Sequence, residues 1–126
     1  MPEGILSGPG EGELLRNEQG NRVVLVKGAL PHVSVFEFTI EGPFEGPEPH
    51  THADETDSFY ILEGELDVYL NGEWTRAAPG AFLSAAPGVE HGFTKRDSGT
   101  VRFLNIHSPG GFEHSLRAMS VQDAEP

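Results

Sequence analysis

The chain has 126 residues, of which 20 are acidic and 8 are basic, and its formal net charge is −12 with neutral histidines. This length suits one compact domain. The acidic balance argues against binding to nucleic acid or anionic lipid, both of which require clustered lysine and arginine. The lack of cysteine excludes disulfides and thiolate metal sites. No apolar run approaches the roughly 20 residues of a membrane span, so we expect a soluble, cytoplasmic protein that acts on a small molecule or a protein partner.

Residues 1–20 are rich in glycine and glutamate, and we expect this N-terminal arm to run over the surface or to pair at a sheet edge. Apolar runs of strand length follow, and several alternate with the period of two that is typical of half-buried strands. The pair Asn71-Gly72 lies between two such runs and predicts a type I′ hairpin turn. The expected strands cover residues 22–27, 32–41, 58–62, 66–70, 74–77, 81–86 and 101–107.

Only the segment of about residues 111–119 has helical periodicity, with Phe112, Leu116 and Met119 on one stripe. We expect this short helix to pack on the outside of the barrel and not to act as a lid. The sequence therefore predicts one all-β domain over residues 1–126. After the N-terminal arm, a barrel or sandwich occupies about residues 21–108 and the helix follows it.

Histidines supply the candidate chemistry. His50 and His52 are two residues apart, and on a strand such residues point to the same face, about 6–7 Å apart. That spacing suits two ligands of one divalent metal, although such pairs also occur on surfaces without a metal. His91 follows a Pro-Gly turn. Either the turn places His91 at the start of the next strand as a third ligand, or His91 only caps the turn. Asp57, five residues after His52, adds a carboxylate.

These residues and their spacings resemble the first motif of the cupin superfamily. In that motif the family has Gly, five residues, His-x-His, three or four residues, Glu, six residues and Gly. This chain has Asp in place of Glu, and its first glycine fits loosely. The corresponding residues are Gly46, His50, His52, Asp57 and Gly64.

The second cupin motif has Gly, five residues, Pro-x-Gly, two residues, His, three residues and Asn. Here Gly80, Ala86-Pro87-Gly88 and His91 correspond to it, with Ala86 for Pro and Lys95 for Asn. The resemblance covers about residues 20–110. Residues 57–65 and 108–113 resemble the small single-domain cupins, or monocupins, related to quercetin dioxygenase, and cupins that act as aromatic polyketide cyclases share much of this pattern.

The resemblance implies a double-stranded β-helix, the jelly-roll barrel of the cupins, and commonly a homodimer. It also implies one divalent transition metal, Fe, Mn, Ni, Co, Cu or Zn, held by His50, His52, His91 and Asp57. The side chain of Asp57 is one methylene shorter than the family's glutamate. We therefore expect it to bind the metal weakly or through water and to act as the catalytic proton acceptor. Asp54 and Glu55 are expected to be surface turn residues.

Strand parity suggests which other side chains line the cavity. Phe93 has the parity of His91, and Phe59 has that of Asp57. Phe59, Phe93 and Phe103 are first of all core residues, and some of them are expected to face the metal. His107 shares its parity with Phe103 and either faces the cavity or forms hydrogen bonds at its mouth.

Three functions are compatible with this pattern. The first is a metal-dependent, dioxygenase-like oxidoreductase that acts on a small aromatic or apolar substrate. The second keeps the metal as a Lewis acid for a cyclase, isomerase or lyase reaction. The third is a non-catalytic cupin that binds a small ligand. The sequence leaves these alternatives open, because a fold does not define a substrate.

Overall fold

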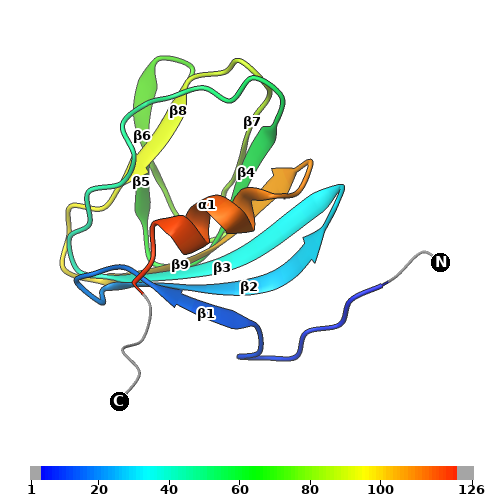
Figure 1. Cartoon of the computed structure of the whole chain (residues 1–126). Helices are drawn as coiled ribbons and strands as arrows, with labels where there is room; N and C mark the ends of the chain where they lie inside the picture. Colours follow the sequence, from blue (N-terminus) through cyan, green and yellow to red (C-terminus); the bar gives the residue numbers. More distant parts are fainter. Residues whose placement is uncertain (1–3, 122–126) are drawn as a thin grey trace.

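The computed structural model describes residues 4–121, which form nine strands and one short helix (Figure 1). Residues 1–3 of the expected arm and residues 122–126 of the expected domain lie outside the described residues. The strands are β1 (Glu13–Arg16), β2 (Arg22–Leu30), β3 (Val33–Glu41), β4 (Thr56–Glu63), β5 (Leu66–Leu70), β6 (Glu73–Ala77), β7 (Phe82–Ala85), β8 (His91–Thr94) and β9 (Thr100–Ser108), and the helix is α1 (Phe112–Ala118).

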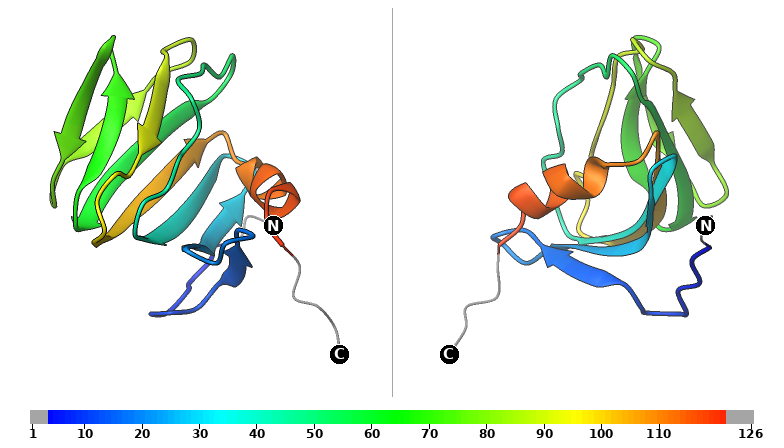
Figure 2. Two further views of the ribbon diagram at one scale, coloured as in Figure 1. Left: turned by 90° about the vertical axis from the view of Figure 1, so that its left-hand side faces the viewer. Right: turned by 45° about the vertical axis from the view of Figure 1, so that its right-hand side comes forward.

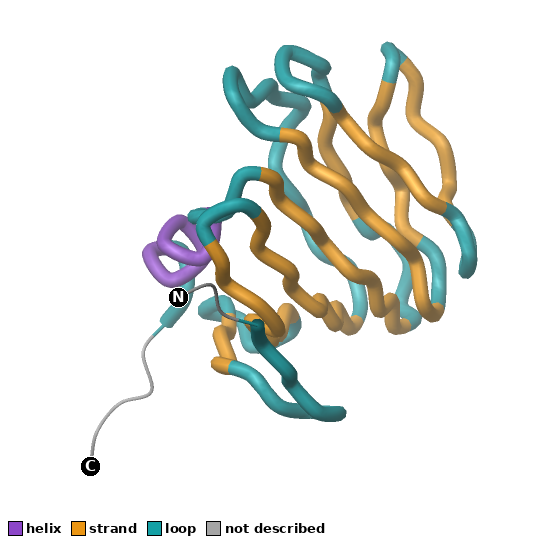
Figure 3. Tube along the Cα trace, turned by 90° about the vertical axis from the view of Figure 1, so that its right-hand side faces the viewer, coloured by secondary structure: helices purple, strands orange, loops and turns teal. Residues whose placement is uncertain are grey.

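Two antiparallel sheets form the barrel. The larger sheet has the order β1-β2-β3-β9-β4-β7, and the smaller one has the order β6-β5-β8. The sheets curve around a common interior (Figures 2 and 3), and side chains of both contribute to one apolar cluster. The predicted class, an all-β double-stranded β-helix with a short C-terminal helix, is confirmed.

The inner face of the larger sheet follows the predicted alternation. In β3 every second side chain from Ser34 to Ile40 is buried. The register places Phe36 opposite Asn105 and Ser34 opposite His107 on β9. Both β9 residues are polar, yet they are only 3% and 1% exposed. Because buried polar groups require partners, the polar stretch of this face indicates a site and not a plain core.

The predicted hairpin turn is present between β5 and β6. Asn71 and Gly72 both have positive φ, at 56° and 81°, as a type I′ turn requires. The turn fixes the register in which Leu70 lies opposite Glu73. It therefore places the buried side chains of β5 on the inner face of the smaller sheet.

Gly64 ends the first predicted motif at a place where only glycine fits. Its φ is 71°, and a Cβ atom there would overlap the carbonyl oxygen of Thr100 at the start of β9. Left-handed backbone costs about 1–2 kcal/mol for other residues, and the overlap with backbone adds to this cost. We expect Gly64→Ala to lower the free energy of unfolding by about 2–4 kcal/mol in urea titrations.

Gly20 provides the matched control, because its φ is 78° but no atom lies within 4 Å of its Cβ position. Gly20→Ala is expected to cost only the conformational part, about 1 kcal/mol. Equal losses for the two variants would show that the close approach to Thr100 contributes nothing to stability.

The N-terminal arm forms an edge strand. β1 pairs with β2 and is the outermost strand of the larger sheet. Ile5, Leu6 and Leu14 of the arm are more than half exposed. The homodimer implied by the resemblance stays a prediction. Among residues 4–121, no helix has the length and apolar character needed to cross a membrane.

The expected position of the C-terminal helix is wrong. α1 lies on the inner side of the larger sheet, across β3 (Figure 1). The Phe112 ring contacts Phe36 at 6.0 Å between ring centroids, and Leu116 is fully buried in the core cluster. The start of the helix is held there by Glu113, whose carboxylate accepts a hydrogen bond from the Ser34 hydroxyl at 2.6 Å.

Candidate metal centre

The two histidines of the first motif do not lie on a strand as the sequence suggested. His50 and His52 lie in the extended loop that leads into β4. A pair of backbone hydrogen bonds of 2.9 Å each joins His50 to His91, the first residue of β8. This bridge holds the loop beside the smaller sheet, while β4 delivers Asp57 from the larger one.

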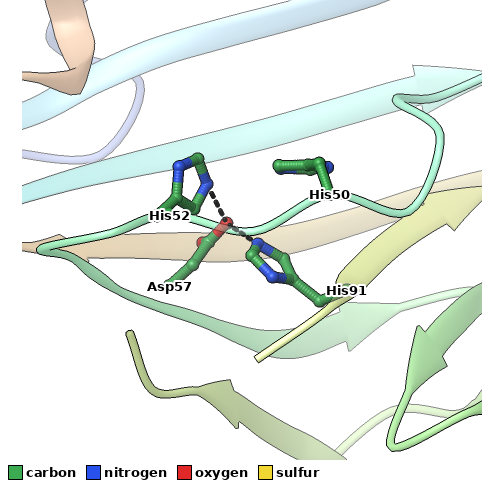
Figure 4. A group of neighbouring side chains, drawn as sticks. All are labelled: His50, His52, Asp57 and His91. Atoms are coloured by element: carbon green, nitrogen blue, oxygen red, sulfur yellow. Dashed lines mark hydrogen bonds and ion pairs between the residues drawn. The ribbon is translucent and has the colours of Figure 1, made fainter. Parts of the chain in front are cut away.

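The structure brings the four candidate ligands together (Figure 4). One possible ligand atom of each residue lies within 4.8 Å of the others, and the residues are His50, His52, Asp57 and His91. Ligand atoms bonded to one ion at about 2.0–2.2 Å lie up to about 4.4 Å apart. The four groups are therefore close enough for small side-chain movements to bring them to one ion.

Backbone carbonyls fix the tautomers of two of these rings. His50 Nδ1 lies 2.8 Å from the carbonyl oxygen of Glu48, and His91 Nδ1 lies 2.9 Å from that of Val89. A carbonyl oxygen only accepts hydrogen bonds, so both Nδ1 atoms must donate a proton to it. The neutral rings therefore keep their lone pairs on Nε2, as metal-binding imidazoles do when the other nitrogen is so held.

His52 presents a buried nitrogen that has no hydrogen-bond partner among the described residues. Its Nε2 is fully buried and lies 3.7 Å from Asp57 Oδ2, which is beyond hydrogen-bond length. Its Nδ1 lies 3.6 Å from a carboxylate oxygen of Glu55. A buried polar atom without a partner costs about 1–3 kcal/mol, and a cation between His52 and Asp57 would remove that cost.

Asp57 completes a set of groups that accept a proton or a cation and have no hydrogen of their own to donate to one another. Its Oδ2 lies 2.9 Å from His91 Nε2, and with the proton of a neutral His91 on Nδ1, two lone pairs face each other. Such a contact is favourable only when a proton or a metal cation lies between the atoms. Oδ1 accepts a hydrogen bond of 2.7 Å from Asn105. Three imidazoles and one carboxylate suit a divalent transition metal, so the residues present fit the ion that the resemblance implies.

The pKa values of this pair shift in opposite directions. Burial raises the pKa of Asp57, but the hydrogen bond that protonated His91 donates, the nearby His107 and the bond from Asn105 outweigh it and lower the pKa. Burial lowers the pKa of His91, but its bonds to Asp57 and to the Val89 carbonyl outweigh it and raise the pKa. Asp57 therefore stays anionic, and protons compete strongly for the His91 lone pair.

Two residues that sequence reasoning did not assign to the site support it. Asn105 orients Asp57 and also accepts a hydrogen bond of 3.0 Å from His107 Nε2. Glu55, expected at the surface, is only 24% exposed and lies 3.5 Å from His107 Nδ1 and 3.6 Å from His52 Nδ1. The alternation of β9 would have found Asn105. No periodic signal marks Glu55, because it precedes β4 in an irregular segment.

A cavity of about 540 Å³ opens beside the cluster, within the range of small-ligand sites. Phe59, Phe93 and His107 line it, as the strand parity suggested. Phe103 differs from the expectation and is fully buried in the core. Its ring packs among those of Phe38, Phe59 and Phe93, at 4.9, 5.5 and 5.6 Å between ring centroids, and it does not line the cavity.

The sequence has a curated relative with a known activity. The chain is 29% identical over 116 residues to quercetin 2,3-dioxygenase of Bacillus subtilis (strain 168). The match covers 84% of this chain and 34% of the relative. The chain thus spans about one third of the length of that relative.

Solved structures and a family model agree on the fold. KdgF from Halomonas sp. superimposes with a TM-score of 0.75 at 18% identity, over 89% of this chain and 99% of that one. An RmlC-like cupin from Shewanella frigidimarina superimposes with a TM-score of 0.74 at 19% identity, over 89% of this chain and 96% of that one. Residues 36–107 match the family model described as the cupin domain. Because this match covers more than half of the sequence, the chain belongs to the cupin family.

Proposed function

We propose that this protein is a metal-dependent, dioxygenase-like enzyme that acts on a small aromatic or apolar substrate. One observation carries the proposal: possible ligand atoms of three imidazoles and one carboxylate converge within 4.8 Å at the wall of a largely aromatic cavity. The proposed ligands are His50, His52, His91 and Asp57. The relative of known activity, a quercetin 2,3-dioxygenase, supports an oxidative reaction on an aromatic molecule.

A divalent ion held by this set would supply Lewis-acid and redox chemistry, with one or two positions left for other ligands. The protein side chains determine what reaches that place. Phe44, Phe59 and Phe93 line the cavity and would contact the faces and edges of a substrate ring. Their apolar surfaces also exclude water from the reacting groups.

Asp57 is the proposed proton acceptor. It lines the cavity and is 4% exposed. The bond from Asn105 holds its Oδ1, so that Oδ2 faces the cluster. Its pKa is lowered, so the carboxylate is ionised at neutral pH. Oδ2 is then available for the proton of a substrate hydroxyl group, whose acidity a bound metal ion would increase.

Metal analysis together with oxygen uptake tests this function. Protein purified without a histidine tag is analysed for metals, and stripped protein is loaded separately with Mn, Fe, Co, Ni, Cu or Zn at pH 7.5. We expect about one ion per chain. With a panel of flavonols, catechols and aromatic carboxylic acids, we expect oxygen to be consumed with at least one compound in proportion to the substrate lost, and metal-stripped protein to be inactive.

Two outcomes would contradict the proposal in different ways. A bound metal with substrate conversion but no oxygen uptake would indicate a cyclase, isomerase or lyase reaction. Protein that cannot be loaded with any of these ions at pH 7.5 would contradict the metal site itself. That second result would favour a cupin that binds a small ligand without catalysis.

A further inference from the structure

Arg22 is a buried cation in the wall of the same cavity. It is the first residue of β2, it is only 7% exposed, and it lines the cavity together with the four proposed metal ligands. One guanidinium nitrogen, Nη2, donates a hydrogen bond of 3.2 Å to the Ser120 hydroxyl. Nε is buried and has no hydrogen-bond partner among the described residues. Part of the guanidinium is therefore unsatisfied.

No carboxylate in the described part of the chain forms an ion pair with Arg22. Burial lowers its pKa, and no neighbouring charge counters that effect. This is unusual in a chain with 20 acidic residues and a net charge of −12. A buried charge without a partner is strongly destabilising. An anionic ligand in the cavity would remove that cost, and the planar guanidinium is well suited to a carboxylate.

The strand register separates Arg22 from the candidate metal centre. Arg22 lies opposite Ile40, near one end of β3. Ser34, near the other end of β3, lies opposite His107, which in turn lies opposite Asp57. The cation and the cluster thus approach the cavity from opposite ends of β3. Aromatic side chains line the wall of the cavity as well, and these are Phe38, Phe44, Phe59, Phe93 and Phe112.

We propose that Arg22 binds a carboxylate group of the substrate, so that the substrate is an aromatic or apolar carboxylic acid. The apolar body would contact the phenylalanine rings, and the end away from the carboxylate would reach the cluster. A dianion such as a phosphate fits less well, because among the described residues Arg22 is the only lysine or arginine that lines the cavity, and Glu45 and Asp57 line it too. The substrate role rests on the proposed function, but binding of the anion at Arg22 does not.

The alternative is a structural role for Arg22 through its bond to Ser120. The two roles predict opposite effects on stability. If Arg22 serves a ligand, Arg22→Met removes an uncompensated buried charge, and the melting temperature of the ligand-free protein is expected to stay the same or to rise. If Arg22 mainly holds Ser120 and the end of α1, the same substitution lowers the melting temperature.

Calorimetric titration of the full, metal-stripped chain at pH 7.5 tests the binding site. The probes are benzoate, phenylacetate and 3-phenylpropanoate, each compared with its neutral amide. We expect at least one acid to bind at least tenfold more tightly than its amide. Arg22→Met is expected to weaken binding of that acid by about 10- to 100-fold and to abolish the difference from the amide. Arg22→Lys keeps the charge but loses the planar guanidinium, and its affinity for the acid should be intermediate. This variant also tests the proposal if Arg22→Met does not fold.

Arg96→Met is the matched control, because it makes the same change in charge at a side chain that is 66% exposed. It is expected to bind the acids as the unmodified protein does. The proposal is overturned if no acid binds at 10 mM, if acids and amides bind equally, or if the Arg22 variants bind the acid unchanged. Since these titrations contain no metal, failure of the metal site would appear only in the metal analysis and would not alter their outcome.

Discussion

Replacing His91 by alanine is expected to remove both the metal and the activity, whereas Asp57→Asn is expected to remove most of the activity and less of the metal. His91 is fixed by β8 and by the Val89 carbonyl, which hold its Nε2 in the cluster, so alanine removes a ligand atom that is already in place. The carboxylate of Asp57 is short and is held at Oδ1 by Asn105. A general base of this kind contributes about 10²–10⁴-fold to a rate, and asparagine would lose that contribution.

Metal content after gel filtration at pH 7.5 and oxygen uptake at saturating metal are the two measurements. His114→Ala serves as the control, because His114 is 76% exposed on α1. Asp57→Glu is expected to tighten metal binding and to slow turnover, because the longer carboxylate reaches further into the cluster. The assignment fails if Asp57→Asn loses the metal as completely as His91→Ala.

Acidification from pH 7.5 to 5.5 is expected to weaken metal binding by about 10- to 100-fold, because affinity falls about tenfold per pH unit for each proton that the ion must displace. The hydrogen bond with Asp57 raises the pKa of His91, so a proton occupies its lone pair at a higher pH than on a free imidazole, whose pKa is about 6.5. The loss of affinity should therefore begin above that pH. Competition titrations with a chromophoric chelator across this range measure the affinity.

Asp57→Asn provides the internal check on this pH dependence. It removes the carboxylate that raises the pKa of His91, so the decline in affinity should move to lower pH. An affinity that does not change between pH 7.5 and 5.5 would show that the ion displaces no proton from an imidazole. That result would contradict a histidine site.

Much of the fold could be predicted from local patterns. The alternation of β3 and the Asn71-Gly72 turn each reflect a rule that acts within a few residues, and the structure follows both. The predicted position of α1 was wrong for a physical reason. An apolar stripe with Phe112 and Leu116 shows that a helix has a face to bury, but it does not show on which side of the sheet that face packs. The contact between Glu113 and Ser34, which are distant in sequence, decides this.

The candidate site was predictable where it depended on spacing. The positions of the histidines and of Asp57 in the two motifs bring them together, and the structure places them within reach of one ion. The supporting shell was less predictable. Asn105 and Arg22 look like ordinary strand residues, and their roles arise from burial and from partners on other strands. Phe103 has the right parity, but it is buried among other phenylalanine rings and does not line the cavity.

The orientation of the rings by main-chain carbonyls has a consequence for sequence drift. The oxygens that hold His50 and His91 belong to the backbone of Glu48 and Val89, so exchanging either side chain leaves the acceptor in place. These two positions can vary through evolution without disturbing the rings beside them. His52 differs, because the group near its Nδ1 is the side chain of Glu55, which one codon change can delete. The orientations of His50 and His91 thus tolerate mutation of the neighbouring side chains, whereas the surroundings of His52 depend on one.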